Sequence, residues 1–486
     1  MQQKICVLEV NEVPIRVWKT YSEQVPTSAV RRLFSEGKLY KTSADDVTAD
    51  FLYPSQTWAS LNTGLSYDAH QIHWYNDPKP QPDQFWWHQA ALSGRRVGLV
   101  NVLHTSPLDH YLTQAPYSFL VPDCFAPNTQ TFPARYCPFQ SMNLQLAKTN
   151  GRIASSRVSE LFTLAKKSLA DPAGFGVTPF TILEGMYTLP KLIKSRERLR
   201  NLQFPPLGSI FFSLLQQNDP DIAVLFTNHI AAAQHRYWYA LFPNDYAEAI
   251  YSDAWVHKYR NDILDAVGIF DRFLKKVSAF CKATDRILLI VSSMGQQANR
   301  KLSSSAVAGR RREFSLSDPL AFLRAAIGPT SARLEGAMVP QYTISFDTSS
   351  QAEYAARQMA DFLRNNPSLS ESSVYVANNK LTMSLLFSSD APISIYDGKK
   401  VGLTTVGVRG FDIDDHHSGC HHADGTLLIW NDTNDALFSP QVTPSSFSYL
   451  RYAAELRRYL HLNEAPVPTI HLKDQHRRVH FDPYIS

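Results

Sequence analysis

The sequence has 486 residues, of which 44% are hydrophobic and 19% are charged, the composition of an ordinary globular protein. Its formal net charge of +4 is too small to indicate a nucleic-acid duplex as a partner. A chain of this length predicts either one large α/β domain with insertions or two to three structural units.

Five cysteines without a CxxC spacing argue against a disulfide framework and favour a reducing compartment. The first residues, MQQKICVLEVNEV, lack the apolar run of a signal peptide. No stretch approaches 18 uninterrupted apolar residues, so we expect no membrane span. These features predict a cytoplasmic protein and leave its oligomeric state open.

Short apolar runs recur along the chain, and each ends in a small or polar residue. They occupy residues 4–10, 95–104, 221–229, 285–293 and 425–432. Helical patterns separate them, most clearly at 253–280, where apolar residues recur at three- and four-residue spacing. Strands that alternate with helices predict an α/β fold with a doubly wound, mostly parallel sheet and helices on both faces.

Two segments interrupt this alternation. The first is rich in Pro, Phe and Tyr and then helical over 150–199. It includes a basic cluster, KLIKSRERLR, that we interpret as a solvated helix face. The second predicts a strand, a helix and a hairpin. The predicted organisation is an α/β core at 1–110, 221–338 and 403–462, a cap insertion at 111–220, a smaller α+β element at 339–402, and a surface tail at 463–486.

Polar residues follow three of the predicted strands. They are Asn11 and Glu12, Asn228 and His229, and Ser292 and Ser293. Ligands of doubly wound sheets bind outside the carboxyl ends of the strands, so these side chains are candidates for a site. A further segment, DIDDHHSGCHHADG at 412–425, holds four histidines and four aspartates and is either a metal site or a flexible solvated loop.

Thr57 lies between a Pro-Ser-Gln turn and a run of small residues. Threonine before a helix-like run is favoured as an N-cap, because its hydroxyl accepts a hydrogen bond from the first turn. The alternative interpretation is that the Thr57 hydroxyl is a nucleophile, since Thr hydroxyls form covalent intermediates in some enzymes. On the residues alone, the N-cap interpretation is the favoured one.

The stretch PSQTWASLNTGLSYDAHQIHW resembles the alkaline phosphatase superfamily, nearest its type I phosphodiesterase/nucleotide pyrophosphatase branch. The resemblance covers most of the chain from Lys4 to Trp430 and includes the order of the strands, the cap insertion and a late histidine. The opening VLEVNEV is also similar to a subgroup of bacterial members of the superfamily. The resemblance implies a phosphoryl-transfer hydrolase or transferase with Thr57 as the nucleophile.

The resemblance also implies two zinc-like ions, but this chain departs from the family at several ligand positions. Asn11, Ala231, Ser293 and Met294 occupy positions where the family has metal ligands, and the last three cannot act as those ligands do. We therefore expect the two-metal site to be lost and at most one Zn or Mn ion to remain. The candidate ligands are His229, His235, and either His421 or His422, with Glu12 nearby.

The remaining candidate residues serve the phosphorylated small molecule or glycan expected as substrate. Asn11 and Asn228 would hydrogen-bond the phosphoryl oxygens, and Arg236 would approach the phosphate. Aromatic residues suited to stacking on a sugar or base complete the predicted substrate site, namely Trp58, His73, Trp74 and Trp238.

Two other interpretations stay open. The lost ligand positions also fit a member of the fold that no longer hydrolyses and instead binds a phosphorylated ligand, a glycan or a partner protein. Alternatively, Glu9 and Glu12 would perform acid–base chemistry on a glycan or nucleotide-sugar.

Overall fold

The computed structural model describes the chain apart from residues 1, 48–51, 73, 76–81, 149–165, 167, 189–200, 310–311, 336–340, 413–415, 439–444, 463–478 and 482–486. The chain forms two compact units. The first consists of Met1–Leu144, Arg152–Ser303 and His417–Pro468, and the second of Gln145–Gly151, Ser304–His416 and Thr469–Ser486.

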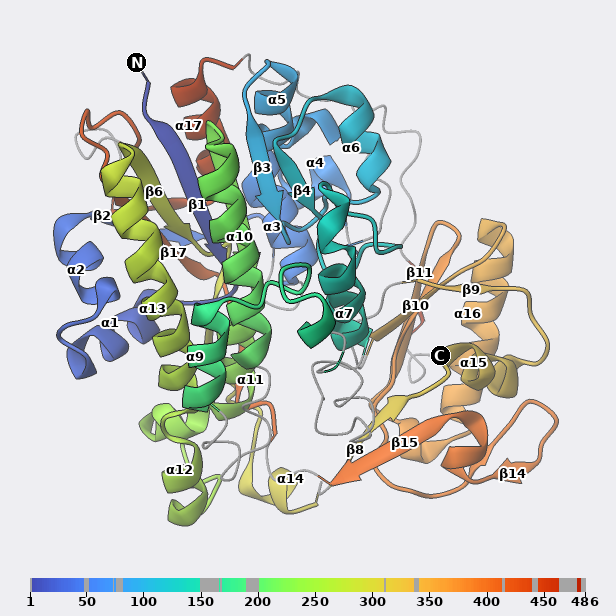
Figure 1. Cartoon of the computed structure of the whole chain (residues 1–486). Helices are drawn as coiled ribbons and strands as arrows, with labels where there is room; N and C mark the ends of the chain where they lie inside the picture. Colours follow the sequence, from blue (N-terminus) through green and yellow to red (C-terminus); the bar gives the residue numbers. More distant parts are fainter. Residues whose placement is uncertain are drawn as a thin grey trace. The chain divides into compact units, whose positions relative to one another are not determined.

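In the described part of the first unit, eight strands form one sheet in the order β18-β2-β17-β6-β1-β5-β3-β4 (Figure 1). Neighbouring strands are parallel except at β17, which is antiparallel to β2 and β6. The predicted mostly parallel α/β sheet is confirmed. The strands are β1 (Lys4–Val10), β2 (Lys38–Ser43), β3 (Val97–Val100), β4 (Phe119–Val121), β5 (Ile222–Thr227), β6 (Arg286–Val291), β17 (Asp424–Trp430) and β18 (Ser446–Ser448).

Helices cover both faces of this sheet, as predicted (Figure 1). The long predicted helix at 253–280 is divided into α12 and α13. The helices are α1 (Ile15–Gln24), α2 (Ala29–Glu36), α3 (Pro54–Thr63), α4 (Tyr67–His70), α5 (Trp86–Leu92), α6 (Leu108–Gln114), α7 (Cys137–Lys148), α9 (Pro179–Thr188), α10 (Phe204–Asn218), α11 (His229–Leu241), α12 (Asp253–Tyr259), α13 (Asp262–Ala283) and α17 (Arg451–Leu460).

Strand β1 shows why the central strands have continuous apolar runs in the sequence. Cys6, Leu8 and Val10 belong to the core cluster that also contains side chains of α10 and α13. Glu9 points to the opposite face and contacts α3. Because successive side chains alternate between two covered faces, nearly every residue of the strand is buried.

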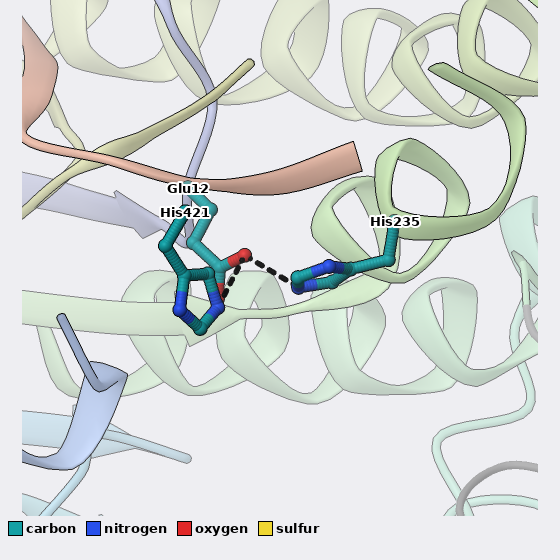
Figure 2. Close-up of side chains that lie close together, drawn as sticks. All are labelled: Glu12, His235 and His421. Atoms are coloured by element: carbon teal, nitrogen blue, oxygen red, sulfur yellow. Dashed lines mark ion pairs between the residues drawn. The ribbon is translucent and has the colours of Figure 1, made fainter. Parts of the chain in front are cut away.

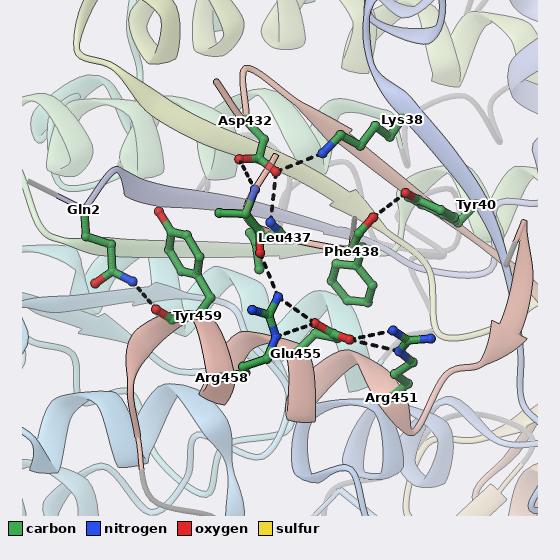
Figure 3. Close-up of polar contacts among 11 residues, drawn as sticks. Gln2, Lys38, Tyr40, Asp432, Leu437, Phe438, Arg451, Glu455, Arg458 and Tyr459 are labelled. Atoms are coloured by element: carbon green, nitrogen blue, oxygen red, sulfur yellow. Dashed lines mark hydrogen bonds and ion pairs between the residues drawn. The ribbon is translucent and has the colours of Figure 1, made fainter. Parts of the chain in front are cut away.

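A polar network fixes the chain between β17 and α17 (Figure 3). The Asp432 carboxylate accepts hydrogen bonds from the backbone N–H of Leu437 at 3.0 Å and from Lys38 Nζ at 3.1 Å. In α17, Glu455 accepts from Arg451 and Arg458. Both contacts of Glu455 lie within α17, and Arg458 Nη2 connects the helix to the segment after β17 by donating to the Ala436 carbonyl oxygen at 2.7 Å. Helix α17 also packs against α3.

The second unit contains a five-stranded antiparallel sheet within its described residues, in the order β19-β11-β12-β10-β9. Its elements are α14 (Ser304–Gly309), β8 (Arg312–Leu316), α15 (Pro319–Ile327), β9 (Arg333–Leu334), β10 (Gln341–Ser345), α16 (Ser349–Arg364), β11 (Ser373–Ala377), β12 (Lys380–Ser384), β13 (Ile393–Ser394), β14 (Lys400–Val401), β15 (Val408–Asp412) and β19 (Val479–Phe481).

This unit is longer than the predicted α+β element at 339–402. The pairing of β8 with β15 brings residues from both sides of that segment into the unit. Strand β19, from the predicted tail at 463–486, pairs with β11. Most of the predicted helical stretch at 150–199 lies outside the described residues, and α9 is the longest described helix within it.

All five cysteines are free thiols. Among the described helices, none is both long enough and apolar enough to cross a bilayer.

Glu9 is a carboxyl group in the core between β1 and α3. Its Oε1 accepts a hydrogen bond from Asn62 Nδ2 at 2.9 Å, and Asn62 Oδ1 in turn accepts from Trp86 Nε1 at 2.8 Å. Glu9 Oε2 and the Tyr452 hydroxyl have no hydrogen-bond partner among the described residues. Burial raises the pKa of Glu9 to about 8, although the hydrogen bond from Asn62 acts in the opposite direction. The side chain is therefore mostly neutral at pH 7.

The Glu9→Gln variant tests this assignment through pH-dependent stability. Between the ordinary pKa of 4.5 and about 8, the folded protein binds more protons than the unfolded chain. The free energy of unfolding of the natural protein therefore falls as the pH rises, by up to about 1.4 kcal/mol per pH unit. We expect urea unfolding to show that the free energy of unfolding of Glu9→Gln, relative to that of the natural protein, rises with pH through this window. Above the window the difference should stay constant.

The exposed Glu23→Gln substitution is the matched control and should follow the natural protein at every pH. Parallel curves for Glu9→Gln and the natural protein would contradict a neutral Glu9.

Candidate metal centre

Three side chains from distant parts of the first unit converge at the carboxyl end of the sheet (Figure 2). Glu12 follows β1, His235 belongs to α11, and His421 lies on β16 (Gly419–His422). His235 Nε2 is 2.8 Å and His421 Nε2 is 3.4 Å from Glu12 Oε2. Glu12 is buried, whereas the side chains of both histidines are 25% exposed. The cluster is therefore open to a ligand from the histidine side.

The sheet and one close approach explain this convergence. Strand β1 lies between β5, which leads into α11, and β6, which leads into β7 (Gly295–Ala298). Strand β7 pairs with β16, and this pairing positions His421, which lies on β16. At Gly419 a Cβ atom would be 2.5 Å from the carbonyl oxygen of Gln234, so only glycine lets β16 approach α11 this closely.

Glu12 is held in an unusual backbone conformation. Its φ of 58° lies in the left-handed region, which is uncommon for a long side chain and concentrates at functional sites. Glu12 Oε1 accepts from Asn11 Nδ2 at 2.7 Å, Oε2 accepts from Gln296 Nε2, and the carbonyl oxygen accepts from Gln234 Nε2 at 3.1 Å. These bonds fix the carboxylate between the two imidazoles.

The electrostatics of the cluster favour a charged carboxylate. Burial works against ionisation of Glu12, but the charges and hydrogen bonds of His421 and His235 outweigh it and hold its pKa well below the usual range. Burial also disfavours the charged form of His421, but Glu12 and a hydrogen bond with the Leu52 backbone outweigh that effect and raise its pKa. Without a metal, Glu12 and His421 thus form an ion pair.

The donor set fits one divalent metal ion. One ligand atom from each of the three residues lies within 4.8 Å of the others. Two imidazoles and one carboxylate are a ligand set of catalytic zinc, which keeps a further position open. His235 Nδ1 is 3.3 Å from the Gly419 carbonyl oxygen, so an Nδ1–H can donate there and leave the Nε2 lone pair for a metal.

Two other predicted ligands lie elsewhere. His229 begins α11, where its Nδ1 contacts Thr227 Oγ1 at 2.8 Å, its Nε2 contacts the Ala266 carbonyl oxygen at 3.2 Å, and its ring stacks on Phe204. Burial lowers its pKa to about 3. His422 is adjacent to His421 on a strand, so the two side chains point to opposite faces, and His422 Nδ1 accepts from the Asp424 backbone N–H.

Thr57 is the fourth residue of α3, and the N-cap of that helix is Tyr53. The N-cap interpretation of Thr57 is therefore wrong, because the helix begins one turn earlier at Pro54. Thr57 is fully buried, and its Oγ1 lies 2.9 Å from Ser293 Oγ, which follows β6. The structure thus places the hydroxyl at the same edge of the sheet as Glu12.

Asn11 connects the other elements of this edge. Its Nδ2 donates to Glu12 Oε1 and to Asn228 Oδ1, the latter at 2.8 Å, while its Oδ1 accepts from Trp58 Nε1 at 2.7 Å. Asn228 is exposed, but Asn11 is buried and its amide is fully engaged. Asn11 is therefore placed to orient Glu12 rather than to bind a ligand directly.

The predicted substrate residues do not form an exposed aromatic rim. Trp58, Trp74, Arg236 and Trp238 are all buried, and Trp238 Nε1 donates to Asp245 at 3.0 Å. His73 lies outside the described residues.

Sequence reasoning did not identify Gln296, which lies on β7 and donates to the Glu12 carboxylate. Its only signal in the sequence is its position four residues after the Ser292 strand end. A glutamine at such a position is unremarkable without knowledge that β7 pairs with β16.

No family model and no curated protein matches this sequence. Solved structures that are similar to the chain over nearly its whole length include the following three. Phosphonoacetate hydrolase from Sinorhizobium meliloti 1021 in complex with phosphonoacetate has 11% identity and a TM-score of 0.38, covering 95% of this chain and 96% of its own. Human ectonucleotide pyrophosphatase/phosphodiesterase 5 has 11% identity and a TM-score of 0.41, covering 96% and 97%. Alkaline phosphatase from the Antarctic bacterium TAB5 has 8% identity and a TM-score of 0.35, covering 95% and 99%.

Metal titration tests the cluster directly. We expect the metal-free protein to bind one Zn²⁺ per chain in calorimetry, and His235→Ala or His421→Ala to abolish this binding because each removes one of three ligands. Affinity should fall as the pH falls, because the raised pKa of His421 makes protons compete with the metal.

His422→Ala is the matched control, since it removes a neighbouring imidazole of the same strand that points away from Glu12. Loss of Zn²⁺ binding in His422→Ala, with binding retained in His421→Ala, would contradict this ligand set.

Proposed function

We propose that this protein is a phosphoryl-transfer hydrolase of phosphorylated small molecules that uses one divalent metal ion, Zn or Mn, and the Thr57 hydroxyl. The observation that carries the proposal is the convergence of Glu12, His235 and His421 at the edge of the sheet where Thr57 also lies. A metal ion bound there would act as a Lewis acid on a phosphoryl oxygen.

Glu12 replaces the carboxylate that the family supplies from the position of Ala231. The aspartate of the family would come from the first turns of α11, four residues before His235, where this chain has alanine. Glu12 reaches the same two histidines from the turn after β1. The chain thus keeps a carboxylate and two imidazoles in one cluster, although the carboxylate comes from a different element.

Thr57 is the candidate nucleophile. It lies in the first turns of α3, where the positive end of the helix dipole favours the negative charge of a phosphoryl group. The neighbouring Ser293 hydroxyl orients Thr57 but does not act as a base, because neither hydroxyl is basic at neutral pH. Since Thr57 is fully buried, a phosphoryl group reaches it only after adjacent side chains move.

Asn11 and Asn228 have different roles in the proposed site. Asn11 holds Glu12 and Asn228 in place through its side-chain amide. Asn228 is exposed at the start of α11, where its amide nitrogen can donate to a phosphoryl oxygen. The chain therefore supplies a neutral donor for the substrate beside the metal ligands.

A second function has a specific observation in its favour. The burial of Thr57 and its pairing with Ser293, rather than with a charged group, also suit a protein that binds a phosphorylated ligand without cleaving it. In that case the metal cluster would serve recognition alone.

Hydrolysis of p-nitrophenyl phosphate and bis(p-nitrophenyl) phosphate with added Zn²⁺ or Mn²⁺ tests the proposal. We expect Thr57→Ala to lower kcat by about 10³-fold or more, as removal of a nucleophile does, and Thr57→Ser to retain part of the activity. Glu12→Gln should lose activity together with metal binding, and His422→Ala should be unaffected.

Activity that is equal in Thr57→Ala and the natural protein would refute the nucleophile. If no preparation hydrolyses either ester but p-nitrophenyl phosphate still binds in calorimetry, the binding function replaces the hydrolase.

A further inference from the structure

Helix α9 exposes an apolar face. Ile182, Leu183, Met186 and Tyr187 are 54%, 63%, 65% and 52% exposed. Their spacing places them on one side of the helix, whereas Phe180, Glu184 and Thr188, spaced four residues apart, are buried on the other. We call the four exposed residues the α9 face.

This concentration is unusual within the chain. Ten large apolar side chains are exposed in its described part, and four of them belong to this single ten-residue helix. Leu169, shortly before the helix, is a fifth and is 77% exposed. Scattered exposed apolar residues need no explanation, but a contiguous group marks an interaction surface.

The charges around the α9 face are positive. Glu184 is the only acidic residue of the helix, and Arg272 of α13 neutralises it through two hydrogen bonds of 2.6 Å. The next turn of α13 carries the exposed Lys275 and Lys276, and Lys276 Nζ lies 4.3 Å from the centre of the Phe180 ring. Lys276 therefore places a positive charge beside Phe180, at the edge of α9.

The sequence around the helix extends this bias. Between Lys148 and Arg200 there are ten lysines and arginines against four acidic residues, a surplus of six. The whole chain has a net charge of only +4, so the rest of the chain is slightly negative. An apolar helical face within a basic segment is the combination that binds anionic membrane surfaces.

We propose that the α9 face attaches this protein peripherally to an anionic lipid surface. Ten residues are too few to span a bilayer but enough to lie in its headgroup region. Tyr187 supplies an aromatic ring with a polar end, which membrane interfaces favour. This inference is independent of the hydrolase proposed above, because none of its residues belongs to the metal cluster.

Two other binding partners would fit the α9 face less well. A second copy of this chain would bring two positively charged borders together, which is unfavourable. A protein partner would need about 20–30 residues on each side, whereas the described α9 face offers four large side chains. A lipid surface requires neither shape complementarity nor a large area.

Sedimentation of the full chain with lipid vesicles tests the proposal. We expect binding to vesicles of phosphatidylcholine with phosphatidylserine, weaker binding to phosphatidylcholine alone, and a decrease at high salt. Leu183→Gln with Met186→Gln should lower the partition coefficient by about tenfold or more, because two buried apolar side chains are lost. Tyr354→Gln is the matched control, since Tyr354 is 60% exposed on α16 of the other unit.

The milder pair Leu183→Ala with Met186→Ala, together with thermal unfolding of every variant, separates binding from folding. A weakened vesicle interaction at an unchanged melting temperature supports the proposal. Three results would overturn it: no sedimentation of the natural protein with either lipid, equal binding of the double variants, or a melting temperature lowered well below that of Tyr354→Gln. The last result would show that another segment of this chain covers the α9 face.

Discussion

The contact on which the candidate site depends is the one between the Glu12 carboxylate and two imidazoles. Glu12 is almost entirely buried, and a buried charge is costly unless it is paired and hydrogen-bonded. His235, His421, Asn11 and Gln296 together provide that pairing. The carboxylate thus holds together a turn, a helix and a strand that are hundreds of residues apart in the sequence.

The sheet determines where this contact forms. β1, β5 and β6 are adjacent and parallel, so the residues that follow them meet at one edge. The Thr57 hydroxyl reaches the same edge through Ser293 after β6, and Asn11 joins the ends of β1 and β5 through Asn228. A change in the position of β1 would therefore disturb the candidate metal ligands, the candidate nucleophile and Asn228 together.

The fold could be predicted from the sequence more fully than the site. The continuous apolar runs of β1, β5 and β6 require two covered faces, and that requirement is visible in local sequence. Local sequence does not predict that Glu12, rather than His229, lies with His235 and His421. This arrangement depends on a left-handed turn at Glu12 and on the close approach at Gly419. His229 looks like a ligand in sequence, but it satisfies both ring nitrogens within the core.

A charge argument applies to the neutral residues at the positions where the resemblance places metal ligands. Asn11, Ser293 and Met294 contribute no negative charge, and a second divalent ion beside them would face only the single carboxylate of Glu12. These positions instead make contacts suited to a site without that ion, since Asn11 donates to Glu12 and Ser293 pairs with Thr57. Replacing Ser293 alone with aspartate would place a second buried carboxylate against Thr57 with no cation to balance it. A site for two metal ions would therefore require several of these residues to change together.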